Sequence, residues 1–86
     1  MNNLVSNLAN NQTIIENRKT GVKEFYSYST KIAEIKTNSD ITFIDSKNWN
    51  YSRTTIKYLC KFLGYKNKNE VLAGVQSGNL ILKDLN

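Results

Sequence analysis

The sequence contains no histidine, no proline and a single cysteine, Cys60. Without histidine, imidazole cannot activate a nucleophile or bind a metal ion. One cysteine argues against a structural zinc site and cannot form an internal disulfide, which fits a reducing cytoplasmic setting. Without proline, the chain has no rigid proline linker. None of the four glycines belongs to a phosphate-cradling loop. We therefore expect no metal, no cofactor and no nucleophilic catalysis.

Long apolar runs are also missing from the sequence. No stretch approaches the roughly 20 apolar residues that a membrane-spanning helix needs, and the N-terminus lacks the basic-then-apolar pattern of a signal peptide. At 86 residues and 40% hydrophobic composition, the chain can form one modest core. We predict a single domain, residues 1–86, located in the cytoplasm.

Positive charge is concentrated in one part of the chain. Between Ser46 and Asn69 there are six basic residues and no acidic residue, giving +6, whereas the whole chain carries only +5. The remainder therefore has a charge of −1. Aromatic residues are interleaved with these basic residues, a composition that suits phosphate contacts and base stacking. The alternative interpretation is a solvated helix face above a few core aromatics.

The strongest helix pattern lies between Trp49 and Tyr65. Ser52 is placed to cap the N-terminus and Gly64 to end the helix in a left-handed conformation. The apolar stripe that we expect to be buried has the spacing i, i+3, i+4 and i+7, and consists of Ile56, Leu59, Cys60 and Leu63. Arg53, Lys57 and Lys61 form a row along another flank, with Tyr58 on the outward side near it.

The first half of the chain suggests strands. We expect residues 3–10 to form a short helix or a loose arm, followed by a strand at 13–15 and a turn at 17–21. Residues 22–36 are rich in strand-forming side chains, and a phase change near Ser29 indicates a bulge or bend. The segments 25–36 and 41–45 are then expected to pair antiparallel.

A second helix is expected after Asn67, which can act as its cap with Glu70 three residues later, and Gly78 as its stop. Leu80–Leu82 follows as a short strand. Two successive helices also suggest a helix-turn-helix, in which the second helix reads the major groove. Here the basic row lies on the first helix, so we favour two helices packed on a sheet.

Catalysis receives little support. Glu24 and Glu34 are separated by an even number of residues and could lie on one sheet face, as paired carboxylates for acid–base chemistry do. However, Lys23 and Lys36 lie close to them in sequence, which fits ordinary surface ion pairs. We predict that the protein is not an enzyme.

Two short motifs resemble a pattern in uncharacterised phage and plasmid accessory proteins of Gram-positive bacteria. The first is the strand motif S-Y-x-T-x-I-A, present here as Ser27–Ala33, and the second is the helix motif Y-S-x-T-T-x-K, present as Tyr51–Lys57. The resemblance covers the middle half of the chain and transfers no functional residue. It implies a mobile-element accessory protein, a class that includes anti-CRISPR inhibitors and DNA-binding regulators. From packing alone, we expect Tyr28, Ile32 and Ala33 to lie beneath Ile56 and Leu59.

The predicted fold is α+β, with a small antiparallel sheet of three or four strands and two C-terminal helices packed on one face. The leading hypothesis is an anti-CRISPR-type inhibitor that acts in the bacterial host cell on a nucleoprotein defence complex. The alternatives are a regulator that binds DNA or RNA directly, and a homodimer or virion component. The predicted binding residues are Lys47, Trp49, Arg53, Lys57, Tyr58, Lys61, Lys66 and Lys68.

Overall fold

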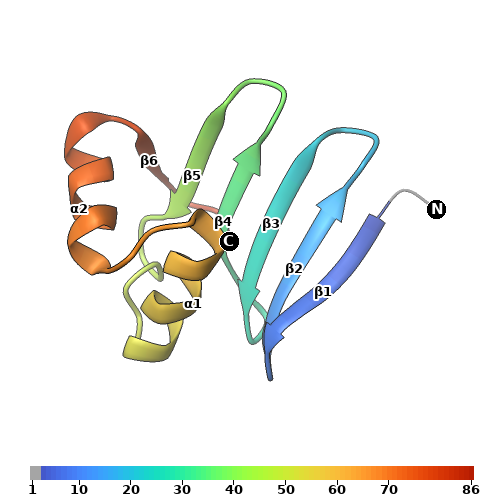
Figure 1. Cartoon of the computed structure of the whole chain (residues 1–86), viewed down its shortest axis with the longest axis horizontal. Helices are drawn as coiled ribbons and strands as arrows, with labels where there is room; N and C mark the ends of the chain where they lie inside the picture. Colours follow the sequence, from blue (N-terminus) through green and yellow to red (C-terminus); the bar gives the residue numbers. More distant parts are fainter. Residues whose placement is uncertain (1–2) are drawn as a thin grey trace.

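The chain folds into a six-stranded sheet with two helices on one face (Figure 1). The structure is a computed structural model and describes residues 3–86. In chain order the elements are β1 (Asn3–Ala9), β2 (Gln12–Asn17), β3 (Val22–Ser27), β4 (Thr30–Lys36), β5 (Ile41–Asp45), α1 (Arg53–Leu63), α2 (Lys68–Ser77) and β6 (Leu80–Lys83). Within residues 3–86, no helix is long and apolar enough to cross a membrane.

The sheet is larger than predicted and it is mixed. Its strand order follows the sequence from β1 to β6, and the first five strands pair antiparallel. β6 pairs with β5 in parallel, from Thr42 opposite Leu80 to Asp45 opposite Lys83. The prediction of an antiparallel sheet of three or four strands is therefore wrong. Parallel neighbours require a long crossover, and here α1 and α2 provide it.

One missed strand lies at the N-terminus. β1 pairs with β2, with Val5 opposite Ile15, so the prediction of a short helix or loose arm for residues 3–10 is wrong. An isolated helix of this length has little stability, whereas pairing with β2 gives partners to the backbone groups along one side of β1. The turn is made by two asparagines, and Asn11 takes a positive φ of 61°. Asparagine tolerates this conformation well, so Asn10-Asn11 was the available hairpin signal.

Residues 22–36 form two strands rather than one bent strand. The chain reverses at Tyr28 and Ser29 between β3 and β4. A separate register shift leaves Ile32 as an extra residue between Lys31, opposite Tyr26, and Ala33, opposite Phe25, and both Ile32 and Ala33 are buried. The predicted phase change was real, but it combines a hairpin turn with a bulge. Of the predicted pairing between 25–36 and 41–45, only β4 with β5 is correct.

Both predicted helices and their caps are confirmed. The Thr55 N–H donates to Ser52 Oγ at 3.1 Å, and Gly64 ends α1 with a φ of 80°. The Glu70 N–H donates to Asn67 Oδ1 at 3.2 Å at the start of α2. α2 approaches β6 closely at Gly74, because a Cβ atom there would come within 2.9 Å of the Leu80 side chain.

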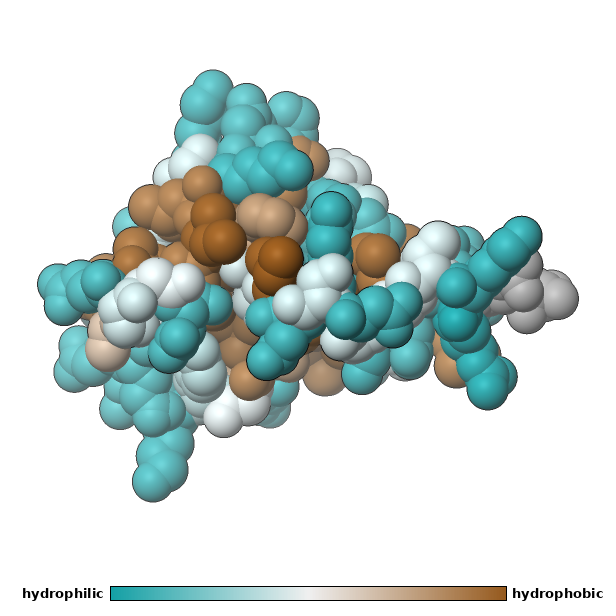
Figure 2. Space-filling model, turned by 90° about the horizontal axis from the view of Figure 1, so that it is seen from above, coloured by the Kyte–Doolittle hydropathy of each residue, from teal (hydrophilic) through white to brown (hydrophobic). Residues whose placement is uncertain are grey.

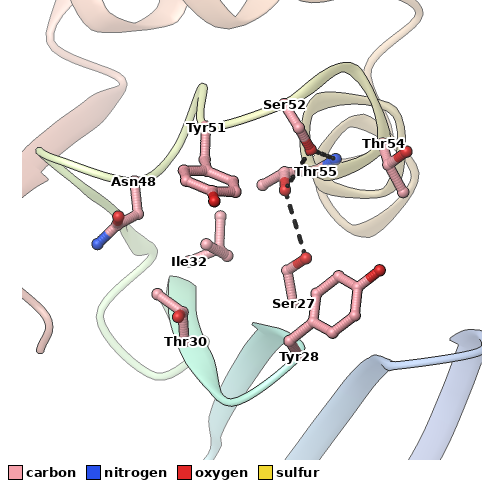
Figure 3. A pocket seen from close by; sticks show the side chains of 9 residues that line it. All are labelled: Ser27, Tyr28, Thr30, Ile32, Asn48, Tyr51, Ser52, Thr54 and Thr55. Atoms are coloured by element: carbon pink, nitrogen blue, oxygen red, sulfur yellow. Dashed lines mark hydrogen bonds between the residues drawn. The ribbon is translucent and has the colours of Figure 1, made fainter.

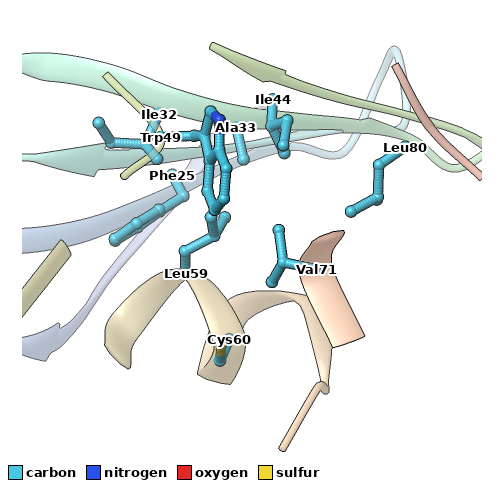
Figure 4. Packing of buried hydrophobic residues seen from close by; sticks show 9 residues of the cluster. All are labelled: Phe25, Ile32, Ala33, Ile44, Trp49, Leu59, Cys60, Val71 and Leu80. Carbon is cyan, nitrogen blue, oxygen red and sulfur yellow. The ribbon is translucent and has the colours of Figure 1, made fainter. Parts of the chain in front are cut away.

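The hydrophobic core lies between the helices and β3–β6 (Figure 4). Leu59 and Cys60 are buried as predicted, whereas Ile56 and Leu63 are only partly buried. The expected packing role holds for Ile32 and Ala33 but not for Tyr28, whose residue surface is 68% exposed. The nine buried core residues are Phe25, Ile32, Ala33, Ile44, Trp49, Leu59, Cys60, Val71 and Leu80. From above, apolar side chains gather in the left half of the molecule, the half that contains α2, β5 and β6 (Figure 2).

The two carboxylates of the predicted sheet-face pair do share one face. Glu24 lies opposite Glu34, and the ammonium of Lys31 makes a salt bridge to each of them. Desolvation lowers the pKa of Lys31, but the hydrogen bonds and charges of both glutamates outweigh it, so the pKa is raised. The lysine that pairs with the two carboxylates is therefore Lys31 rather than the predicted Lys23 or Lys36. The β4 bulge places Lys31 on the same sheet face as Glu24 and Glu34. With two carboxylates sharing one ammonium, this triad is a structural ion-pair cluster rather than a free pair of carboxylates.

Candidate functional site

The exposed side of α1 carries a row of cationic side chains. Arg53, Lys57 and Lys61 recur every fourth residue and all three are exposed. The buried residues of the helix, Leu59 among them, face the core. A helix turns about 100° per residue, so this spacing keeps the three charges on one solvent-facing flank.

The row forms one wall of a hollow of about 450 Å³, which we call the basic groove. Gly64 reverses the chain after α1, and the short connection to α2 forms the opposite wall. This brings Lys66 and Lys68 to the same hollow as the α1 row. The groove is lined by Arg53, Ile56, Lys57, Cys60, Lys61, Tyr65, Lys66, Asn67 and Lys68.

The electrostatics of the groove are one-sided. Of its nine lining residues, all within the described part of the chain, five are cationic and none is acidic. The nearest carboxylate in sequence, Glu70, accepts a hydrogen bond from the Lys66 N–H at 2.7 Å. Burial, and secondarily the charge of Glu70, raises the pKa of the Cys60 thiol. Cys60 therefore stays protonated at neutral pH and belongs to the apolar floor rather than to a reactive centre.

Tyr58 orders two of the lysines without lining the groove. The ammonium nitrogens of Lys57 and Lys61 lie 5.3 Å and 5.2 Å from the centroid of its ring. Both distances are within the range of cation–π attraction. Tyr58 itself is half-buried and packs against the core. It restrains the two charges on the outer flank of α1, a role that differs from base stacking.

Two predicted binding residues lie elsewhere. Trp49 is only 7% exposed and belongs to the core, so it offers no ring for stacking, although Lys68 Nζ lies 6.0 Å from its ring centroid. Lys47 is exposed on the loop before α1 but does not line the groove. The structure thus brings five of the eight predicted residues together in one hollow, with Tyr58 beside them.

A second, larger hollow of about 630 Å³ was not predicted (Figure 3). It lies between the first turn of α1 and the β3–β4 turn, and we call it the hydroxyl pocket. Its lining consists of Ser27, Tyr28, Thr30, Ile32, Asn48, Tyr51, Ser52, Thr54 and Thr55. Eight of these nine residues belong to the strand motif or the helix motif noted in the sequence, and Asn48 is the ninth. The available signal was thus the density of hydroxyl side chains in two motifs far apart in the chain.

Three hydroxyls of this pocket bond to one another. Thr55 Oγ1 lies 3.0 Å from Ser52 Oγ and 3.3 Å from Ser27 Oγ, shown as dashed lines in Figure 3. Thr55 and Ser27 are buried, so these bonds offset the cost of removing their hydroxyls from water. The contacts fasten the first turn of α1 to the end of β3.

The loop leading to α1 is fixed by a buried carboxylate. Asp45 accepts hydrogen bonds from the Asn48 N–H at 2.9 Å, from Asn48 Nδ2 at 2.7 Å and from the Leu85 N–H at 2.8 Å. Desolvation raises the pKa of Asp45, but these bonds outweigh it and leave the pKa below its usual range. Asp45 therefore remains ionised at neutral pH and joins the loop to the segment after β6.

Comparison with known proteins identifies the family of the chain. A search of curated proteins and a search of solved structures find no match. Within residues 3–86, no group of three or more histidine, cysteine, aspartate or glutamate side chains could hold a metal ion. A family model, described as a family of unknown function (DUF8033), matches residues 2–78. The match covers most of the sequence, so the chain belongs to this family.

Proposed function

We propose that this member of the DUF8033 family is a non-enzymatic accessory protein of a phage or plasmid. In this proposal it acts in the bacterial cytoplasm as an anti-CRISPR-type inhibitor of a nucleoprotein defence complex. The basic groove occupies an acidic surface or a nucleic-acid path on that complex. The observation that carries the proposal is the convergence of five cationic side chains on one hollow.

Mutual repulsion gives the groove a physical reason to bind an anion. Arg53, Lys57 and Lys61 are neighbours on one helix, and like charges at this spacing cost a few tenths of a kcal/mol per pair. Lys66 and Lys68 add to the same field from the facing wall. A polyanionic partner turns this repulsion into attraction and steers the encounter over roughly a Debye length, about 8 Å at physiological salt.

The mobile-element origin is supported by the two motifs that resemble phage and plasmid accessory proteins. Both motifs lie in well-defined parts of the fold, the strand motif at the β3–β4 turn and the helix motif at the start of α1. An inhibitor without catalytic machinery has to act as a stoichiometric binder. An arginine and ordered lysines on a rigid helix suit that role, because arginine is a common interface anchor and lysine steers association.

A second candidate function is direct binding of DNA or RNA by a regulator. The absence of a carboxylate among the nine described lining residues favours it, since no lining group would repel a phosphate. If all five cations contacted phosphates, the slope of log K against log salt would be about −4.5 for a duplex.

The experiment uses a charge reversal in the groove and a matched reversal outside it. Lys57→Glu with Lys61→Glu alters the groove, while Arg18→Glu with Lys19→Glu makes the same change in net charge on the exposed β2–β3 turn. We expect the groove variant to stop protecting a phage or plasmid in a host with an active CRISPR system, and to lose the effector complex in co-purification. The turn variant should retain both.

Equal behaviour of the two variants would contradict a specific role for the groove. Mobility shifts at low salt then separate the two candidate functions. Binding of nucleic acid by the wild type, lost in the groove variant, without any protection of phage or plasmid, supports the regulator. Protection without nucleic-acid binding supports the inhibitor acting on an acidic protein surface.

A further inference from the structure

The hydroxyl pocket differs from an ordinary packing defect in its lining. None of its nine residues, all in the described part of the chain, is charged, while five carry a serine or threonine hydroxyl and two a phenol. Its volume of about 630 Å³ is in the range of small-molecule sites, roughly 300–1,000 Å³. Such a site suits a ligand with a flat ring and several neutral hydrogen-bonding groups.

Two exposed tyrosines border this pocket. Tyr28 is 68% exposed and Tyr51 is 79% exposed, so neither ring gains much from burial in the fold. In Figure 3 the Tyr51 ring points from the loop toward Ile32, and the Tyr28 ring lies on the other side, below the first turn of α1. Exposed aromatic rings at the border of a polar hollow are typical of sites that stack a planar group.

The backbone of Tyr28 holds its ring at a conformational cost. Its φ is 59°, the left-handed region that glycine or asparagine adopts far more readily than tyrosine. The Tyr28 N–H donates to the Asn11 carbonyl oxygen at 2.6 Å, which fixes the turn against the β1–β2 hairpin. Folding alone favours glycine or asparagine here, so the ring of Tyr28 is a candidate for a contact outside the fold.

The pocket and the basic groove adjoin each other on α1. Ser52 and Thr54 line the pocket, and Arg53 between them lines the groove. A strand whose phosphates follow Arg53, Lys57 and Lys61 therefore reaches the pocket at the N-terminal end of the helix. The first turn of α1 carries no acidic side chain that would repel it.

We propose that the hydroxyl pocket receives one unpaired nucleotide of a single strand whose phosphates lie in the basic groove. The base stacks on Tyr28 and Tyr51, and the hydroxyls of the pocket contact its polar edge and sugar. This inference rests on the proposed function, because the groove supplies the phosphate contacts. It adds that the partner's nucleic acid is recognised in single-stranded form.

The test measures the affinity of the protein for labelled oligonucleotides by fluorescence anisotropy. The probes are single-stranded DNA and RNA of about 12 nucleotides, the length of one single-strand binding site, and the matching duplexes. Tyr28→Gly removes the ring and also relieves the left-handed strain, so it should not unfold the protein. Tyr51→Ala removes the other exposed ring. Each should weaken single-strand binding about tenfold and leave duplex binding unchanged.

Three variants serve as controls. Tyr28→Phe keeps the ring and should retain most of the single-strand affinity. Asn11→Gly relaxes another left-handed residue without changing the lining and should bind like the wild type. Lys57→Glu with Lys61→Glu should weaken binding of both nucleic-acid forms. In a strand containing 2-aminopurine, binding should quench fluorescence with the wild type and much less with Tyr28→Gly.

The possible failures distinguish this inference from the proposed function. If the groove variant loses binding but Tyr28→Gly and Tyr51→Ala bind single strands like the wild type, the pocket takes no nucleotide and the groove proposal stands. If no oligonucleotide binds at low salt, the proposal for the hydroxyl pocket and the proposal of a DNA- or RNA-binding regulator are both wrong. The inhibitor is then judged by the phage and plasmid survival assay alone.

Discussion

The two hollows beside α1 have opposite chemistry. The hydroxyl pocket is neutral and partly buried hydroxyls line it, whereas five cationic side chains line the basic groove. Both use residues of the first helical turn, where Thr54 and Arg53 are adjacent in sequence. A single helix thus borders two hollows, because the adjacent residues Arg53 and Thr54 are separated by about 100° around its axis.

The two linings differ because a buried hydroxyl can be satisfied by its neighbours, whereas a charged side chain stays exposed to water. Thr55 can be nearly inaccessible because Ser52 and Ser27 satisfy its hydroxyl. No such local arrangement satisfies a lysine ammonium, so Lys57 and Lys61 remain at the surface. Substitutions in the groove should therefore change binding more than stability, and substitutions of the buried pocket residues should change stability first.

The largest effect is expected at Leu59, which is fully buried in the hydrophobic core. Leu59→Ala should lower the free energy of unfolding by about 2–5 kcal/mol, because it removes buried methyl groups and leaves a cavity. Lys57→Ala, on the exposed flank of the same helix, should change it by less than about 0.5 kcal/mol. Urea denaturation followed by circular dichroism measures both, and equal losses would show that the assignment of helix faces is wrong.

A smaller effect is expected when Asp45 loses its charge. Its folded-state pKa lies below the usual value of 3.8, so ionised Asp45 stabilises the fold above that value. This contribution should be lost as pH falls through the folded-state pKa. Asp45→Asn should cost about 2–3 kcal/mol at pH 7, the scale of hydrogen bonds to a charged group.

The check on Asp45 is a series of denaturation curves from pH 7 to acid. The difference in unfolding free energy between wild type and Asp45→Asn should be constant near neutral pH and shrink below pH about 4. A difference that stays constant down to the most acidic measurement would show that the charge of Asp45 contributes nothing.

The smallest effect is expected within the hydroxyl cluster. Thr55→Val keeps the shape of the side chain but removes the hydroxyl, and should cost about 1 kcal/mol. Ser27→Ala should cost a similar amount, and the double variant less than the sum, because the two hydroxyls bond to each other. Thermal denaturation of all four proteins gives the coupling, and strict additivity would mean that this bond does not contribute to stability.

The sequence predicted what is encoded locally. The caps Ser52 and Asn67, the stop at Gly64 and the cationic row all depend on residues within one or two turns of each other, and the structure has them as expected. Lys66 and Lys68 joined the row in space because Gly64 reverses the chain beside it. Local patterns therefore sufficed for most of the basic groove.

What was missed depends on contacts between distant segments. The phase change near Ser29 indicated a bend, but no residue type there marks a tight hairpin turn, because tyrosine rarely adopts the left-handed conformation that Tyr28 has. Trp49 was predicted to bind through its ring, but the fold buries it in the core, which no local pattern indicates. The hydroxyl pocket is formed by β3, β4, the loop between β5 and α1, and α1 itself, so no short window of sequence contains its lining.

The pairing of β5 with β6 has a consequence for the order of folding. Every other pairing in the described sheet joins strands that follow one another through a short turn, while β6 must wait for both helices. Hairpins close in microseconds, and contacts between distant segments form more slowly. We therefore expect the meander of β1–β5 to gain protection from hydrogen exchange before β6 does.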